Sequence, residues 1–285
     1  MTVGLVLGAG GPLGWAYHLG VIEGLREAVG HEPAMADRIV GTSAGGAIAA
    51  SLLAGANTNE VLEAITRPPT AEEMATYEEA SAKRKGLRRL RPLAPSLILK
   101  LGPRGGATAL AGLLPEGVFP TASLRRFPTA GLDQWPERLW MPSVRLDDGK
   151  VVVFGRDRTD VSVSDAIEAT AAVPGLFQPK MIGEHRFLDG AVASATHAHL
   201  LVDDGHRMVL VSSPMTRPGR GVLQLRAARQ LRTEVDALER AGTDVVVVGP
   251  DAAIMATAQG FPRKNPNRGH AIVAAAKAQV VRALS

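Results

Sequence analysis

The sequence predicts an α/β fold in which a mostly parallel sheet lies between layers of helices. Short apolar runs at residues 3–8, 207–211 and 244–248 are typical of buried parallel strands. Segments with apolar residues at three- and four-residue spacing alternate with these runs, which indicates helices between the strands. A chain of 285 residues with 46% apolar side chains can bury one core, so we expect a single domain over residues 1–285.

The first elements form a strand–helix–strand unit. The apolar run 3–8 ends in a glycine-rich segment, 8–14, and a helical pattern follows over 15–29 and stops at Gly30. A second strand is expected over 38–40. It runs into another glycine-rich turn and an alanine-rich helix over 47–54. A right-handed crossover is the default for such a unit.

The segment 58–140 is the least regular part of the chain, and we expect a cap or insert there. It begins with a helical stretch at 59–66, continues through an acidic patch and a basic segment, and ends in a loop rich in glycine and proline. Regular patterns then return. They predict a strand over 150–154, a helix over 163–172, and helices over 222–240 and 270–284.

The basic residues are concentrated in one segment. The chain has a net charge of +4, yet Lys83 to Arg104 contains eight basic residues and no acidic one, which leaves 24 basic against 28 acidic residues elsewhere. We expect contact with an anionic membrane surface, or a basic loop that faces water. The segment contains no aromatic residue to stack on bases, so nucleic acid is not expected as a partner. The contact would use Lys83, Arg84, Lys85, Arg88, Arg89 and Arg91.

The composition also limits the chemistry and the compartment. The chain contains no cysteine, which excludes disulfides, a thiolate nucleophile and cysteine-bound metals. Residues 1–8 lack a basic leader, and no uncharged apolar run approaches the ~18 residues of a membrane span. We therefore expect a cytoplasmic protein, peripheral at the membrane if the basic segment binds lipid.

A candidate nucleophile lies in the second glycine-rich turn. Gly41-Thr42-Ser43-Ala44-Gly45 matches Gly-x-Ser-x-Gly, in which a serine occupies a tight strand-to-helix turn. Gly41 and Gly45 would form this nucleophile elbow, and the following helix N-terminus favours a developing oxyanion. The alternative is a glycine-rich turn with a capping serine.

The first glycine-rich segment is open to three interpretations. A dinucleotide-binding loop, as in an oxidoreductase, would need glycine where Leu13 stands and an acidic residue where the second strand ends at Gly41. An oxyanion hole would use the backbone amides of Gly10 and Gly11, because adjacent parallel strands place both loops at one sheet edge. The third interpretation is a structural turn.

Ser43 needs a base, and two kinds are available. A Ser–His–Asp hydrolase could use His197 or His206, although only one strand–helix unit precedes the serine, unlike an α/β-hydrolase. The other candidate is Asp189, which stands between an apolar strand end and Gly190.

Together these motifs resemble the patatin-like phospholipases. That family has a glycine-rich oxyanion loop, a Gly-x-Ser-x-Gly elbow, an alanine-rich stretch ending in Pro-Gly-x-Phe, and an Asp-Gly-Gly or Asp-Gly-Ala motif. The chain has these elements in that order at residues 8–14, 41–45, 169–177 and 189–191.

The resemblance implies a three-layer patatin-like fold and a lipid acyl hydrolase that needs no cofactor or metal. It also implies a dyad in which Asp189 takes the proton of Ser43, an acyl-enzyme forms, and Gly10 and Gly11 hold the oxyanion. Phospholipid, lysophospholipid and neutral esters are the candidate substrates.

One position departs from the family pattern. Leu13 stands where members usually carry arginine or lysine, which removes a positive charge near the substrate and favours neutral esters or lysolipids. The same departure leaves open a catalytically silent, lipid-binding relative.

Overall fold

A mixed sheet with eight strands runs through the described part of the chain, in the order β5-β6-β3-β2-β1-β7-β8, with β4 paired to β3. The computed structural model describes residues 2–30, 32–86, 92–101, 106–216, 221–262 and 264–284. The strands are β1 (Val3–Leu7), β2 (Arg38–Gly41), β3 (Leu139–Arg145), β4 (Val151–Phe154), β5 (Lys180–Ile182), β6 (His185–Asp189), β7 (Met208–Ser212) and β8 (Asp244–Val248).

The sheet is parallel over most of its width. Strands β3, β2, β1, β7 and β8 pair in parallel, whereas β4, β5 and β6 add to the β3 end in antiparallel pairs. The α/β fold predicted from the sequence is therefore confirmed. Because the parallel strands share one direction, their carboxyl ends form a single edge, where the loops after β1, β2 and β7 meet.

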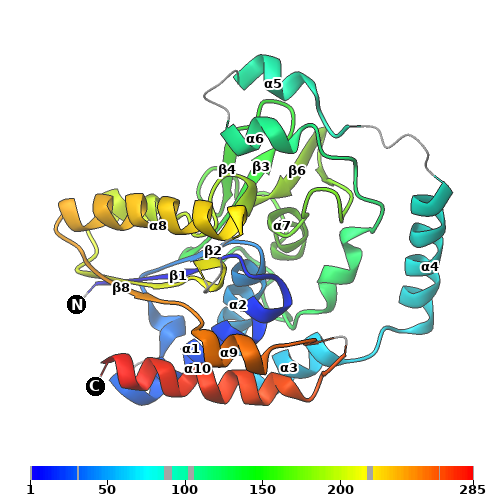
Figure 1. Cartoon of the computed structure of the whole chain (residues 1–285). Coiled ribbons are helices and arrows are strands. Elements are labelled where there is room, and N and C mark those ends of the chain that lie inside the picture. Colours follow the sequence, from blue (N-terminus) through cyan, green and yellow to red (C-terminus); the bar gives the residue numbers. More distant parts are fainter. Residues whose placement is uncertain are drawn as a thin grey trace.

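Helices cover both faces of the sheet (Figure 1). The helices are α1 (Gly11–Val29), α2 (Ala44–Leu53), α3 (Thr58–Thr66), α4 (Ala71–Gly86), α5 (Ser96–Leu101), α6 (Gly106–Ala111), α7 (Val163–Thr170), α8 (Val222–Arg240), α9 (Ala252–Thr257) and α10 (Arg268–Leu284). Alternation along β1 separates the two cores. Leu5 and Leu7 pack with α1, α2 and α10, whereas Val6 packs with Leu231 and Leu238 of α8.

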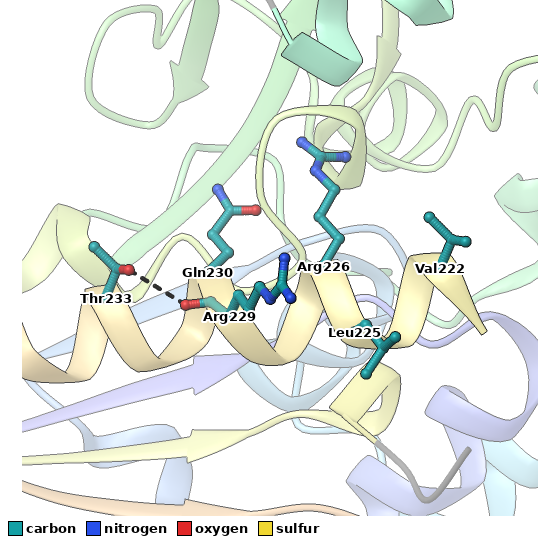
Figure 2. Close-up of a pocket in the computed structure, with 6 residues that line it drawn as sticks. All are labelled: Val222, Leu225, Arg226, Arg229, Gln230 and Thr233. Carbon is teal, nitrogen blue, oxygen red and sulfur yellow. Dashed lines mark hydrogen bonds between the residues drawn. The ribbon is translucent and has the colours of Figure 1, made fainter. Parts of the chain in front are cut away.

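Helix α8 is also bonded to the turn that follows β6. Arg226 and Gln230 extend from one side of the helix (Figure 2) and donate to the carbonyl of Ala193 at 3.3 and 2.8 Å. Arg226 also donates to the carbonyl of Val192 at 3.0 Å. These bonds satisfy backbone acceptors that no strand or helix uses.

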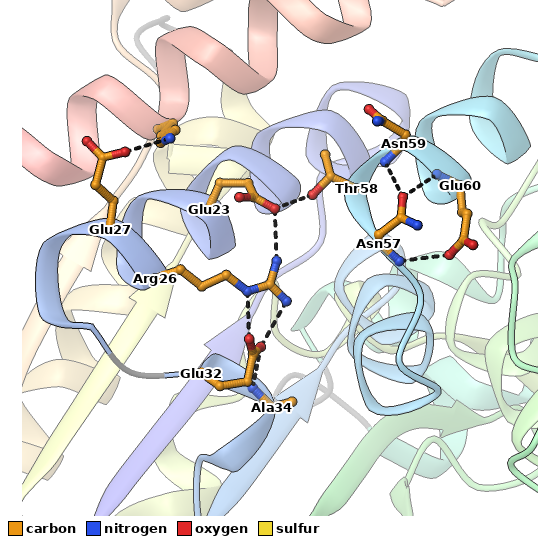
Figure 3. Close-up of polar contacts among 10 residues, drawn as sticks. Glu23, Arg26, Glu27, Glu32, Ala34, Asn57, Thr58, Asn59 and Glu60 are labelled. Atoms are coloured by element: carbon orange, nitrogen blue, oxygen red, sulfur yellow. Dashed lines mark hydrogen bonds and ion pairs between the residues drawn. The ribbon is translucent and has the colours of Figure 1, made fainter.

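Polar contacts tie the C-terminal half of α1 to its neighbours (Figure 3). Arg26 donates to Glu23 and Glu32, and Thr58 at the start of α3 donates to Glu23. Asn57 and Glu60 form the capping box that starts α3, each accepting a backbone N–H of the other. The ion pairs are exposed and individually weak, so they fix orientation more than they stabilise the fold.

The segment between β2 and β3 contains more regular structure than its composition suggests. Residues 71–86, where the sequence showed only an acidic patch entering the basic segment, form α4. Leu93 and Leu97, the latter in α5, pack in a small core with Val144 and Leu188 of the sheet. This places residues 93–97 beside the strand that ends at Asp189. A single domain with a cap over 58–140 stays a prediction.

Candidate active site

Ser43 lies in the turn between β2 and α2. Its backbone has φ +54° and ψ −116°, a conformation that side-chain-bearing residues rarely adopt, and it is the N-cap of α2. Gly41 ends β2, and Gly45 lies in the first turn of α2. A Cβ added to Gly45 would stand 1.9 Å from the carbonyl oxygen of Leu7, so glycine is required for the helix to approach β1 this closely.

The structure brings the hydroxyl of Ser43 and the carboxylate of Asp189 together. The hydroxyl donates to Asp189 Oδ2 at 2.7 Å, across 146 residues of sequence. Asp189 is the last residue of β6, and it pairs with Ser143 of β3, the strand between β6 and β2. Because β2 stops at Gly41 while β3 continues, the turn after β2 can cross β3 near Pro142 and Ser143 and reach the end of β6.

Asp189 is buried, and its burial and its hydrogen bonds shift its pKa in opposite directions. Its side chain is 3% exposed, and burial raises its pKa to about 7. Hydrogen bonds from the backbone N–H of Ala191, at 2.8 Å to Oδ1, and from the Ser43 hydroxyl lower the pKa but do not outweigh burial. A carboxylate with a pKa near neutrality is a much better proton acceptor than an exposed aspartate.

Thr170 holds the serine turn in place. Its hydroxyl oxygen accepts the Ser43 backbone N–H at 3.1 Å and donates to the carbonyl of Pro142 at 2.6 Å. The threonine is fully buried at the end of α7 and links three elements. Thr170 lies in the alanine-rich stretch 169–177, where no motif predicts a role for it.

The glycine-rich segment after β1 lies at the same sheet edge. Gly10 is the N-cap of α1, and Gly11, its first residue, has φ +56°, which favours glycine. Gly10 packs against Pro214, which follows β7. With its N-terminus at this edge, α1 adds the positive end of its dipole to the site.

His18 hydrogen-bonds to the start of this glycine-rich segment and to the end of β7. Its Nε2 lies 2.7 Å from the carbonyl oxygen of Gly8, and its Nδ1 lies 2.8 Å from Ser212 Oγ. A carbonyl can only accept, so Nε2 carries the proton and Nδ1 accepts from the serine hydroxyl. Burial lowers the pKa of His18 to about 4, which keeps the ring neutral near pH 7. Sequence reasoning missed this pair.

Neither histidine proposed as a base is placed to act on Ser43. His197 is fully buried, its Nδ1 lies 3.3 Å from Thr42 Oγ1, and burial lowers its pKa to about 3. His206 precedes β7, at the opposite edge of the sheet, where its ring lies beside Gly4. Within the described ranges, no histidine hydrogen-bonds to Ser43 or Asp189.

Leu13 and the basic segment are the two remaining sequence features. Leu13 is half-buried and packs against the larger core. Of the cations expected to contact a membrane, Arg88, Arg89 and Arg91 lie outside the described residues. The same holds for the side chains of Lys83, Arg84 and Lys85.

The described part of the chain contains neither a metal-binding cluster nor a membrane-spanning helix. Its His, Asp and Glu side chains include no group of three or more arranged to hold a metal ion. None of its helices combines the length and the apolar character needed to span a bilayer.

Comparisons with known proteins give a family match and distant structural likenesses, among them two crystal structures. The model of the family described as patatin-like phospholipase matches residues 5–202. A comparison with curated proteins gave no significant match. The crystal structure of VipD from Legionella pneumophila is 13% identical, with a TM-score of 0.47, over 99% of this chain and 66% of that one. The type III effector protein ExoU is 16% identical, with a TM-score of 0.42, over 99% of this chain and 53% of that one. The chain thus spans less than two thirds of either structure's length.

Proposed function

Because the chain belongs to the patatin-like phospholipase family, we propose that it is a lipid acyl hydrolase in which Ser43 and Asp189 perform the reaction. The observation that supports this proposal most directly is the 2.7 Å hydrogen bond from the Ser43 hydroxyl to Asp189 Oδ2. The donor is a strained, buried serine, and the acceptor is a carboxylate whose pKa burial raises to about 7. Both features are typical of groups adapted for proton transfer.

In the proposed mechanism, Ser43 Oγ attacks the ester carbonyl carbon while its proton moves to Asp189. The carbonyl oxygen becomes an oxyanion that accepts from the backbone amides of Gly10 and Gly11, where a single donor is commonly worth ~3 kcal/mol. The ester C–O bond then breaks, and Asp189 returns the proton to the departing alcohol. A water molecule then attacks the acyl-enzyme and gives a proton to Asp189. As the bond between the acyl carbon and Ser43 Oγ breaks, Asp189 passes this proton to Ser43 Oγ, which releases the acid and restores the hydroxyl and the carboxylate.

For the substrate class, we propose esters without a strongly recognised anionic head group. At position 13 the family commonly has a cation, whereas this chain has leucine, and that leucine packs into the core. A phosphate would therefore lack a charge partner at this position. Neutral esters fit this proposal better than esters whose head group carries a phosphate.

A membrane partner is proposed from the sequence alone. The eight cations between Lys83 and Arg104, with no acidic residue among them, would favour an anionic surface by about 1 kcal/mol for each cation near it.

The proposed function is tested by hydrolysis of lysophospholipid, phospholipid and neutral ester by wild-type protein and three variants. Ser43→Ala should abolish turnover, and Asp189→Asn should lower kcat by 10³-fold or more. Ser51→Ala is the matched control, because its hydroxyl donates to the Ala47 carbonyl within the same helix, away from the site. A folded wild-type protein inactive on every ester would favour a silent, lipid-binding relative. Activity that persists in Ser43→Ala would contradict the proposal.

A further inference from the structure

The N-terminal end of α8 exposes aliphatic side chains that nothing in the described structure covers. Val222 is 81% exposed, Leu223 64% and Leu225 49%. Single exposed aliphatic residues are common on protein surfaces, but here three occur in the first turn of one helix. An exposed apolar helix end of this kind is typical of a surface that meets an apolar partner.

The charges on the same part of α8 are all positive. Residues 222–233 include Arg226, Arg229 and Arg232 and no acidic residue. Within the described residues, neither Arg229 nor Arg232 forms an ion pair. Arg229 and Arg232 lie in the middle of α8, where the helix dipole gives a cation no stabilisation. These positive charges complement an anionic partner.

Six residues of α8 line one groove along the helix (Figure 2), and Leu223 and Arg232 are not among them. The groove has a volume of about 520 Å³. Its aliphatic residues lie at the start of α8, and its guanidinium, amide and hydroxyl groups follow one to three turns later. The lining residues are Val222, Leu225, Arg226, Arg229, Gln230 and Thr233. An amphipathic molecule with an apolar chain and an anionic head matches this order of side chains.

This end of α8 adjoins the candidate active site. Arg226 donates to the carbonyls of Val192 and Ala193, in the turn that immediately follows Asp189. Helix α8 also contacts the short helix η6 (Pro214–Thr216), whose Pro214 packs against Gly10. A partner on the start of α8 would therefore lie next to both the carboxylate and the glycine-rich loop.

A second exposed aliphatic pair borders the site from the other side. Val173 and Leu176, each 39% exposed, lie in the loop after α7. The adjoining Ala172 carbonyl accepts the backbone N–H of Asp189 at 3.0 Å. Exposed apolar groups thus occur on two segments, one bonded to Asp189 itself and the other to the turn that follows it.

We propose that the N-terminal half of α8 docks this protein on an anionic lipid bilayer. Val222, Leu223 and Leu225 would enter the acyl region while Arg229 and Arg232 meet lipid phosphates. The proposal rests on the proposed function, because docking here would bring lipid esters to Ser43. It names a surface separate from the basic segment at 83–104.

The test is sedimentation of Ser43→Ala protein with vesicles, so that no vesicle is hydrolysed and binding is measured without turnover. Vesicles of phosphatidylcholine alone are compared with vesicles containing phosphatidylserine. Preferred binding to the anionic vesicles is expected. Adding Leu223→Ser and Leu225→Ser should weaken binding to both vesicles ten-fold or more. Adding Arg229→Gln and Arg232→Gln should remove most of the preference for phosphatidylserine.

Two matched controls carry equivalent changes elsewhere. Met35→Ser alters a residue that is 59% exposed in the 3-10 helix Pro33–Met35, and Arg240→Gln alters an exposed arginine at the other end of α8. Both should bind vesicles like the parent, and thermal melting checks that every variant is folded. The proposal is overturned if the α8 variants also bind like the parent. It is equally overturned if only substitution of Lys83, Arg84 and Lys85 reduces binding. If the protein binds vesicles as expected but the wild-type protein hydrolyses no ester, the docking proposal stands and only the proposed function is rejected.

Discussion

The ionisation of Asp189 controls whether the candidate site can react. Burial raises its pKa to about 7, so below that pH the carboxyl is protonated and cannot accept the proton of Ser43. We therefore expect kcat/KM for a soluble ester to fall about ten-fold for each pH unit below 7 and to level off above it. The measurement is a pH–rate profile from pH 5 to 9. A rate independent of pH between 5 and 7 would contradict this role of Asp189.

The same carboxyl makes stability depend on pH. Below about pH 4 it is neutral in both the folded and the unfolded protein and carries no penalty. As the pH rises towards 7, the unfolded chain ionises while the folded one stays protonated, so roughly 4 kcal/mol of stability is lost. Asp189→Asn removes this penalty. Urea unfolding should find the variant more stable than wild type at pH 8 and similar at pH 4, whereas equal stability at pH 8 would count against a raised pKa.

His18 is expected to affect turnover without touching the substrate. Its Nε2–H donates to the Gly8 carbonyl, two residues before Gly10, so it positions the loop that would bind the oxyanion. His18→Ala should lower kcat 10- to 100-fold with little change in KM. His18→Gln, whose amide can donate to the same carbonyl, should recover part of the loss. Equal defects in both variants would indicate a purely structural role.

At the scale of single residues, the sequence predicted the chemical groups but not their supports. Ser43 and Asp189 belong to short motifs, which can be read without knowing the fold. Thr170 and His18 act through bonds to backbone groups 127 and 10 residues away. Such bonds require only a donor or an acceptor at the right place, so they leave no pattern in one sequence.

Among the elements, α8 uses one buried carboxylate to fix the segment that follows β6, the strand that ends at Asp189. Glu234 accepts from Ser194 Oγ at 2.6 Å, Thr196 Oγ1 at 2.5 Å, the Ala198 N–H at 2.9 Å and His199 Nδ1 at 3.1 Å. Burial opposes its ionisation, but these donors and nearby His197 together lower its pKa. The stabilisation is therefore present above pH 4.5 and is lost as the pH falls through the lowered pKa.

Replacing this carboxylate should destabilise the protein. In Glu234→Gln the amide NH2 group would face one of these hydrogen-bond donors and leave it without an acceptor. The free energy of unfolding in urea at pH 7 should therefore fall by about 2–3 kcal/mol. Glu239→Gln, an exposed change on the same helix, should cost less than about 0.5 kcal/mol. Similar costs for the two variants would show that the bonds to Glu234 contribute little.

The helices and strands that could be predicted from the sequence have a clear local pattern of apolar residues, and those that were not predicted lack one. The strands at β1, β7 and β8 are uninterrupted apolar runs, and the helices α1, α8 and α10 have clear periodicity. Strand β3 was missed because Pro142 interrupts its apolar run, although six of its seven residues are buried. Helix α4 was missed because its charged residues obscure the periodicity, so composition suggested irregular structure.

At the scale of the molecule, α1 and α10 pack closely together and cover one side of the larger core. A Cβ on Gly20 would stand 2.5 Å from the Val273 carbonyl oxygen, and one on Gly24 would stand 2.7 Å from Val280 Cβ. Gly20→Val and Gly24→Val should each lower the free energy of unfolding in urea by about 1–3 kcal/mol, because the new side chains would collide with α10. Ala274→Val, on the exposed side of α10, is the matched control and should cost less than about 0.5 kcal/mol. Losses equal to the control would contradict this packing.

The fold class was predictable at this scale because alternating strands and helices leave few ways to build layers. The packing of α1 against α10 was not predictable. It joins residues about 250 positions apart in sequence through glycines, which carry no apolar signal. The family match ends at residue 202, before α8 and α10, although both helices cover the sheet that carries the site.

The central claim is that Asp189 activates the Ser43 hydroxyl as the nucleophile. Its most direct test is reaction with a fluorophosphonate probe followed by mass mapping of the modified peptide. We expect one adduct on Ser43, absent in Ser43→Ala and formed at least 100-fold more slowly in Asp189→Asn. An adduct on another residue of the active protein, or labelling of Asp189→Asn at the wild-type rate, would contradict it.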